Sequence, residues 1–417
     1  MSRYNLDFCE QYAYPPQVAG QLEAICDTVS ETIGSRLLSL ILFGSTSRGE
    51  FTCVRNNGSM IPWSDYEFLG VVDGRPRELN RLLAERLSEL EQAFGSLSPL
   101  FHIDCSLVSL EELRKLPRIV RHFETKQLGK VLMGEDLRYR MPEVTAENID
   151  LRDVNEILLW RYWSLVLYTP MELFDSEPNV ERRTLYSYIL CRNVQDIPTF
   201  LLPHLGVLIP GFRARQKWLQ KNLSGDRPDN IIDDELIAFL DQTARGKLDL
   251  QFPDVIEDLV RDTAGAFYKA RRLMCGRFNV NCNGEAPWRK IFKDHWTSRR
   301  KGFEILMMAN GSLGLHATDA AWLAKPKHGL AFQALAGLFD SAASKLNGNS
   351  ERAEMLLGPV DSYLGDLIPG YTPDACVDGP FSRRWAERRR WIVRFMIAYV
   401  PSLGSKHEYL SRLIDGL

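Results

Sequence analysis

Two short apolar runs early in the chain predict neighbouring β-strands. Residues 37–43 are almost wholly apolar, and residues 65–72 (DYEFLGVV) follow after a polar stretch. Runs of this length and composition are typical of strands in a buried sheet. Side chains on a strand alternate between its two faces, so Asp65 and Glu67 lie on one face and the intervening aromatic residue on the other. We therefore expect a polar patch on an otherwise buried sheet.

Helical periodicity surrounds these strands. In residues 18–33 and again in residues 75–94, apolar side chains recur at spacings of three and four, and each segment ends before a glycine that can terminate a helix. A third run, residues 101–108, alternates like a strand, and Ser109 and Glu112 after it have the spacing of a helix-starting capping box. The expected order is helix, strand, strand, helix, strand.

The pattern changes beyond the first third of the chain. From about residue 149, long helical periodicities are separated by polar breaks, and no further alternating run stands out after residue 144. A chain of 417 residues also exceeds one typical domain. We therefore divide it into residues 1–145, which contain the strands, and a mainly helical region of residues 146–417. A division of the helical region into two subdomains near residues 279–288 is an option, because a polar break lies there.

The composition is that of an ordinary globular protein, with 45% hydrophobic and 25% charged residues and a net charge of -3. That charge disfavours a long nucleic acid as the main partner. No apolar run approaches the roughly 20 residues of a membrane span, and the first residues lack a signal-peptide core. The eight cysteines include no Cys-x-x-Cys pair, which favours reduced thiols over zinc ligands or disulfides. We therefore expect a cytoplasmic protein without a membrane partner.

Residues suited to chemistry gather around the predicted strands. Gly44 and Ser45 end the first strand, where a glycine allows a tight turn with exposed N–H groups. The carboxylates of Asp65 and Glu67 repel each other, and oxygen ligands of this kind suit Mg²⁺ or Mn²⁺. Asp104 lies on the face of its strand opposite the apolar residues. The alternative is a set of solvent-facing carboxylates on an edge strand.

These residues, in this order, resemble the nucleotidyltransferase superfamily that includes DNA polymerase β. The matching pieces are residues 43–45, 48–50 and 64–69, and their context is most similar to the bacterial minimal nucleotidyltransferases and the aminoglycoside adenylyltransferases. The resemblance implies an α+β fold with a mixed sheet flanked by helices, in which residues 126–134 supply the closing strand. One departure is the insertion of residues 53–62, which lengthens the spacer between the turn and the acidic strand.

The resemblance also implies an activity. Members of this superfamily transfer a nucleoside monophosphate from an NTP, such as ATP, to a hydroxyl group with the help of Mg²⁺ or Mn²⁺. The implied site residues are Asp65, Glu67 and Asp104 for catalysis and metal binding, and Gly44, Ser45 and Arg48 for the nucleotide.

Several of these roles have alternatives. Arg48 could instead be an exposed helix arginine, with Glu50 as a structural partner, and the general base could be Asp104 or a carboxylate of the helical region such as Glu156. The acceptor of first choice is a small hydroxylated molecule, with a protein hydroxyl or a second nucleotide as alternatives. A non-catalytic module, acting as a sensor or as the partner of a toxin, is the second functional hypothesis. Neither the base of the NTP nor the oligomeric state follows from the sequence.

Three basic or aromatic segments have both a functional and a structural interpretation. Residues 383–391 combine arginines with tryptophans, which could bind bases and phosphates, although a helix with its tryptophans in the core is more common. Residues 299–301 could likewise line a cleft, but a surface position is more common. Residues 160–163 are expected in the core.

Overall fold

The computed structural model describes residues 3–56, 59–95, 100–176, 178–223, 232–277, 328–368, 371 and 379–399. These residues form two compact units. The first unit contains Met1–Asp150 together with Gly206–Arg215, and the second, here called the helical unit, contains Leu151–Leu205 and Gln216–Leu417. The chain is thus α+β, with its main sheet in the first unit. The expected division near residues 279–288 lies outside the described residues, as do residues 299–301.

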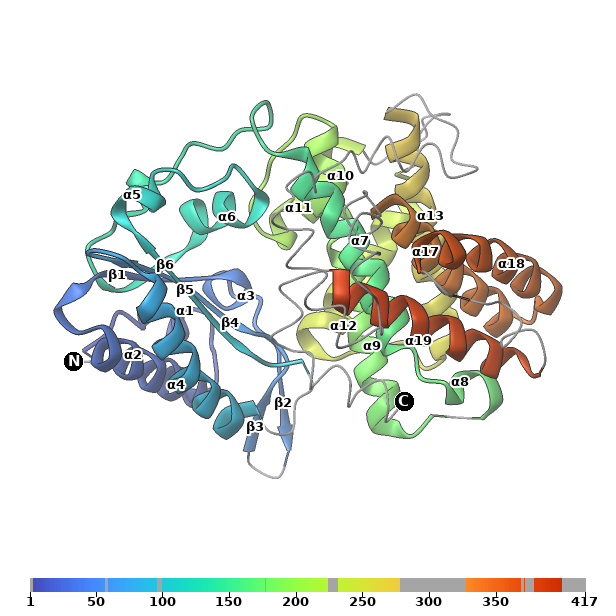
Figure 1. Ribbon diagram of the computed structural model, residues 1–417, viewed down its shortest axis with the longest axis horizontal. Coiled ribbons are helices and arrows are strands. Elements are labelled where there is room, and N and C mark those ends of the chain that lie inside the picture. Colours follow the sequence, from blue (N-terminus) through green and yellow to red (C-terminus); the bar gives the residue numbers. More distant parts are fainter. Residues whose placement is uncertain are drawn as a thin grey trace. The chain divides into compact units, whose positions relative to one another are not determined.

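A four-stranded mixed sheet organises the first unit (Figure 1). Its strands are β1 (Leu37–Phe43), β4 (Tyr66–Val72), β5 (Ile103–Ser109) and β6 (Lys130–Gly134), in the spatial order β5-β4-β1-β6. β1 pairs antiparallel with β4 and β6, whereas β4 and β5 are parallel. The three apolar runs of the sequence therefore form strands, and the alternation of their side chains divides the sheet into two differently covered faces.

One face of the sheet is covered by α2 (Pro16–Ile33) and α4 (Arg77–Gly95), the two amphipathic helices that the periodicity predicts (Figure 1). Tyr66 and Phe68 point into this core and are fully buried. The other face packs against α5 (Leu110–Leu113) and the segment after β6, and α6 (Val120–Leu128) also contacts β1. Glu67, between the two aromatic residues, therefore belongs to this second face.

The insertion of residues 53–62 forms a separate antiparallel pair, β2 (Cys53–Asn56) and β3 (Ser59–Pro62). It extends the spacer without separating the strands on either side of it, because Phe43 at the end of β1 still pairs with Glu67 near the start of β4. The short helix α3 (Gly44–Ser47) follows β1 directly. The turn and the acidic strand thus remain neighbours despite the longer connection.

The expected strand at residues 126–134 is correct only from Lys130 onward, because residues 126–128 end helix α6. Gly129 marks the change from helix to strand. A Cβ atom at Gly129 would lie 2.5 Å from the carbonyl oxygen of Thr125 and 2.9 Å from the side chain of Ile41. The chain therefore passes from α6 into β6 at a position too crowded for any other residue. This crowding is a tertiary effect that the apolar pattern does not reveal.

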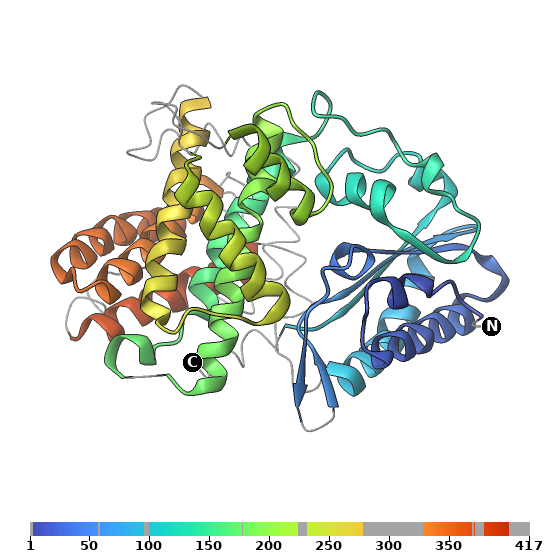
Figure 2. The same ribbon diagram turned by 180° about the vertical axis from the view of Figure 1, so that it is seen from behind.

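The described part of the helical unit contains helices and no strand (Figure 2). Tyr162 lies at its centre, fully buried, with its ring edge-on to three phenylalanines. This confirms the expectation that residues 160–163 contribute to the core. None of the described helices is long and apolar enough to cross a membrane. The helices of this unit are α7 (Leu151–Tyr168), α8 (Glu172–Asp175), α9 (Val180–Gln195), α10 (Ile197–His204), α12 (Asp234–Asp249), α13 (Ile256–Arg277), α17 (His328–Leu346), α18 (Ser350–Leu367) and α19 (Phe381–Tyr399), with α11 (Phe212–Leu223) beginning in the first unit.

Helix α19 contains the arginine- and tryptophan-rich segment and uses it for packing. Trp385 is fully buried and donates its indole N–H to the carbonyl oxygen of Leu338 at 2.9 Å. Arg388 pairs with Asp361 at 2.5 Å, and the buried Arg389 donates to the carbonyl oxygen of Thr169. Trp385 therefore lies in the core as the structural interpretation expects, whereas Arg388 and Arg389 are buried and not on a solvated face.

Candidate functional site

The turn after β1 is held tightly against β4. Gly44 has a φ of +75°, a conformation that side chains disfavour, and a Cβ atom there would lie only 2.0 Å from Oε2 of Glu67. Tyr14 donates its hydroxyl to the carbonyl oxygen of Thr46 at 2.8 Å, and the Thr46 hydroxyl donates to the carbonyl oxygen of Asp65 at 3.3 Å. The positive φ therefore favours glycine at this position, and the Glu67 carboxylate lies directly beside it.

Ser45 follows in the first turn of α3 and is partly exposed. Its carbonyl oxygen accepts hydrogen bonds from the backbone N–H groups of Arg48, at 3.2 Å, and Glu50, at 2.9 Å. These bonds close a compact loop immediately after the sheet. The predicted nucleotide-binding pair, Gly44 and Ser45, therefore lies on a rigid turn that touches the acidic strand.

Glu67 lies between two neighbouring strands. It pairs in register with Phe43 on β1 and with Asp104 on β5. Burial raises the pKa of the Glu67 carboxyl, Arg121 opposes this rise, and the negative charge of Asp65 adds to it. The facing positions of Glu67 and Asp104 are those that the sequence analysis expected for carboxylates on neighbouring strands.

Asp65 is turned toward His102, a residue of the same polar face. Oδ1 of Asp65 accepts a hydrogen bond from the backbone N–H of His102 at 3.0 Å and lies 2.7 Å from the ring nitrogen Nδ1. The side chain of Asp65 is only 13% exposed. This carboxylate therefore has protein partners that fix its orientation at the start of β4.

Asp104 is bound by Arg121, a residue that the sequence analysis missed. Nη2 of Arg121 lies 2.7 Å from Oδ2 of Asp104, and its guanidinium carbon lies 4.6 Å from the centre of the Phe43 ring. Arg121 is in the first turn of α6. No local pattern indicates Arg121, because its helix overlaps the segment expected to be a strand and its contact joins residues from different elements.

The three acidic residues fit a divalent cation in their chemistry and in their backbone positions, but their side chains do not converge. Within the described ranges, no group of three His, Cys, Asp or Glu side chains is placed to hold a metal ion. The reason is that Asp65 faces His102 and Asp104 faces Arg121. The sequence predicts a cation beside these carboxylates, and in the structure the side chains of His102 and Arg121 lie there instead.

Arg48, predicted to bind the nucleotide, belongs to an ion-pair cluster, defined as Arg48, Glu50, Glu124 and Arg215. Its Nε donates to Glu50 at 2.7 Å and its Nη1 to Glu124 at 2.8 Å. Burial alone lowers the pKa of Arg48, but the two carboxylates outweigh burial and raise it. The pairing with Glu50, offered above as an alternative, is therefore present, and Arg48 is buried instead of exposed.

The ion-pair cluster also fastens a distant segment to the first unit. Oε1 of Glu124 accepts hydrogen bonds from the backbone N–H of Gly211 at 2.9 Å and from Arg215 at 2.5 Å. Glu50 accepts the backbone N–H of Phe212 at 3.1 Å. These contacts explain why Gly206–Arg215 belongs to the first unit although the sequence analysis assigned it to the helical region.

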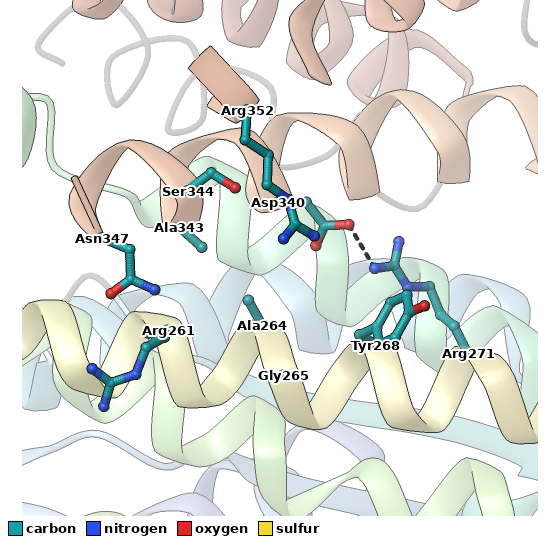
Figure 3. Close-up of a pocket in the computed structure, with 10 residues that line it drawn as sticks. All are labelled: Arg261, Ala264, Gly265, Tyr268, Arg271, Asp340, Ala343, Ser344, Asn347 and Arg352. Atoms are coloured by element: carbon teal, nitrogen blue, oxygen red, sulfur yellow. Dashed lines mark hydrogen bonds and ion pairs between the residues drawn. The ribbon is translucent and has the colours of Figure 1, made fainter. Parts of the chain in front are cut away.

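A separate hollow of about 210 Å³ lies in the helical unit between α13, α17 and the start of α18 (Figure 3). Two of its three arginines have acidic partners. Arg271 is directed toward Asp340 at 2.6 Å (Figure 3), and Arg261 pairs with Asp258 and Asp262 at the surface. The hollow is smaller than the roughly 300 Å³ of typical ligand pockets. The third arginine, Arg352, comes from the start of α18.

No family model matches the sequence, and no curated protein matches it. Among solved structures, the chain is similar to spectinomycin adenyltransferase AAD(9) from Enterococcus faecialis, solved with ATP and spectinomycin. The two sequences are 16% identical, the match covers 61% of this chain and 98% of that chain, and the TM-score is 0.35. Agreement at this level is partial, so the functional interpretation rests on the residues of this chain.

Proposed function

We propose that the protein is a nucleotidyltransferase that moves a nucleoside monophosphate from an NTP to a hydroxyl group of a small acceptor. The observation that carries this proposal is the contact between the Gly44 turn and Glu67, which has Asp104 as its register partner. A turn with backbone N–H groups suits phosphate oxygens, and carboxylates beside it suit the divalent cation that accompanies an NTP. The net charge of -3 favours a small acceptor over a long nucleic acid.

Each residue of the site has a role in this proposal. Asp65, Glu67 and Asp104 would hold Mg²⁺ or Mn²⁺, which when bound stabilises negative charge on the phosphate oxygens. The hydroxyl oxygen of the acceptor attacks the α-phosphorus, the bond from that phosphorus to the bridging oxygen breaks, and pyrophosphate leaves. Asp104 is more exposed than Asp65, with side-chain exposures of 36% and 13%. We therefore assign the proton of the acceptor hydroxyl to Asp104.

A second candidate is a non-catalytic module that binds a nucleotide or a protein partner. The observation that favours it is the pairing of Asp65 with His102 and of Asp104 with Arg121, which satisfies two of the three carboxylates without a metal ion. Such a module would bind without turnover. The two candidates therefore differ in whether an NTP is consumed and in whether a divalent cation is needed.

The first experiment is to measure thermal stability with each of the four NTPs, with and without Mg²⁺, and pyrophosphate release under the same conditions. A ligand at a hundredfold excess over its Kd stabilises the folded protein by roughly 2.7 kcal/mol. We expect one or more NTPs to stabilise the wild type in the presence of Mg²⁺, and Asp65→Asn to lose this effect while staying folded.

The matched control is Glu111→Gln, which neutralises a carboxylate whose side chain is 75% exposed on the same unit. It should behave like the wild type. Stabilisation by an NTP that persists in Asp65→Asn would contradict the assignment of the site. Binding without pyrophosphate release, tested with a panel of hydroxylated acceptors, would favour the non-catalytic module.

A further inference from the structure

Arg121 reaches across the polar face of the sheet from outside it. It begins on α6, passes over the ring of Phe43 at the end of β1, and ends at the carboxylate of Asp104 on β5. In the order β5-β4-β1 the strand between these two contacts is β4, which carries Glu67. The guanidinium thus contacts Asp104 directly, and its charge opposes the rise that burial causes in the pKa of Glu67.

The contacts of Arg121 differ from those of the buried arginines. Its side chain is 41% exposed, and that of Asp104 is 36% exposed, whereas Arg48 and Arg215 are 14% and 5% exposed within the ion-pair cluster. Exposed ion pairs contribute little to stability, because water and salt screen them. Arg121 can therefore leave Asp104 at small cost, while the buried arginines cannot leave their partners.

We propose that Arg121 is the resident counter-ion of Glu67 and Asp104, and that Arg121 and a divalent cation bind these carboxylates in alternation. This inference rests on the proposed function for the identity of the cation. Its physical basis is that both cations require the same carboxylate oxygens and repel each other at short range. Glu67 and Asp104 can satisfy either cation, but not both with full contacts.

Release of Arg121 has a second consequence for the site. A guanidinium that has left a carboxylate presents a planar group of N–H donors, which binds phosphate oxygens in a bidentate manner. Arg121 is anchored close to the Gly44 turn, because α6 contacts α3. It would then contact the triphosphate once the divalent cation has taken its place. Arg121 should therefore oppose the binding of the metal alone and assist the binding of the metal with the NTP.

The test is to measure Mn²⁺ affinity without any nucleotide, by calorimetry or by the electron paramagnetic resonance of free Mn²⁺. Arg121→Met should bind Mn²⁺ up to about fivefold more tightly than the wild type, the upper factor expected for loss of an exposed ion pair. Arg121→Lys keeps the charge and should lie close to the wild type. Arg118→Met removes an exposed arginine from the same region and should change nothing. Adding Asp104→Asn to Arg121→Met should abolish the gain.

The second measurement is the KM for the NTP at saturating Mg²⁺, which should rise in Arg121→Met and recover partly in Arg121→Lys. Opposite effects of one substitution on Mn²⁺ and on the NTP distinguish alternation from a merely structural role. Unchanged or weaker Mn²⁺ binding in Arg121→Met, or no Mn²⁺ binding in any variant, would overturn the inference. If the Mn²⁺ results are as expected but no NTP is consumed, only the proposed function is wrong. If an NTP is consumed but Mn²⁺ affinity is the same with and without Arg121, only this inference is wrong.

Discussion

Glu124 provides a quantitative test of the ion-pair cluster. Burial by itself raises the pKa of this carboxyl, but Arg48, Arg215 and the backbone N–H of Gly211 reverse the effect and lower it from 4.5 to about 2. Each pKa unit corresponds to about 1.4 kcal/mol, so ionised Glu124 stabilises the folded state by about 3 kcal/mol. Glu124→Gln keeps the size of the side chain but leaves the two guanidiniums with one carboxylate. We therefore expect it to destabilise the first unit by about 3 kcal/mol.

The dependence on pH has a definite sign. Because the folded-state pKa of Glu124 is lowered, its contribution is fully present above about pH 4.5 and is lost as the pH falls toward the folded value of about 2. The free energy of unfolding of the wild type should therefore approach that of Glu124→Gln on acidification. Between about pH 5.5 and about pH 3.5 the difference should narrow by about 1 kcal/mol.

The assay is equilibrium unfolding in urea, read by a hydrogen-exchange pulse on peptides of the first unit so that its unfolding is followed separately from that of the helical unit. Glu143→Gln is the matched control. It breaks an ion pair to Lys126 in which the Glu143 side chain is 66% exposed, and it should cost less than about 1 kcal/mol. A loss in Glu124→Gln as small as in this control, or a difference from the wild type that stays constant across the pH range, would refute the reasoning.

Three further predictions concern the turn, the acidic strand and α19. Gly44→Ala should destabilise the first unit and weaken NTP binding. The control is Gly74→Ala: Gly74 also has a positive φ but no atom near an added Cβ, so the substitution should cost only the backbone strain of about 1–3 kcal/mol. Equal effects of the two substitutions on stability and NTP binding would exclude a role for the Glu67 contact. Glu67→Gln should lower transfer activity by about a hundredfold or more with little change in thermal stability, as measured by pyrophosphate release. Trp385→Phe removes the indole donor to the carbonyl oxygen of Leu338, which still accepts the Ser341 hydroxyl, and the lost hydrogen bond should destabilise the helical unit by about 0.5–1.5 kcal/mol in urea unfolding.

The elements that the sequence predicts well are those specified by nearby residues. The strands at residues 37–43, 65–72 and 101–108 and the helices that end at Gly34 and Gly95 follow from local periodicity, which is read within a few turns of chain. The capping box of Ser109 and Glu112 is local too, and the structure contains both of its hydrogen bonds.

The contacts that the sequence does not reveal join residues that are far apart in the chain. Arg48 and Glu124 are 76 positions apart, and Arg215 lies 91 positions beyond Glu124. No periodicity links such residues, because their meeting depends on how α6 and Gly206–Arg215 pack against the sheet. Arg121 escaped prediction for the same reason. The acidic residues of the candidate site could be predicted because they lie on one strand or on two neighbouring strands.

Charge balance distinguishes the two ionic groups of the first unit. The ion-pair cluster contains two guanidiniums and two carboxylates, it is neutral, and all four side chains are at most 14% exposed. At the candidate site, three carboxylates face one guanidinium and one imidazole, and the outer pair is more than one-third exposed. In the neutral ion-pair cluster each charge is paired, so the cluster stabilises the fold. A group with excess negative charge that is accessible to solvent favours a further cation, and this excess is why we propose Glu67 and Asp104 as the site of the chemistry.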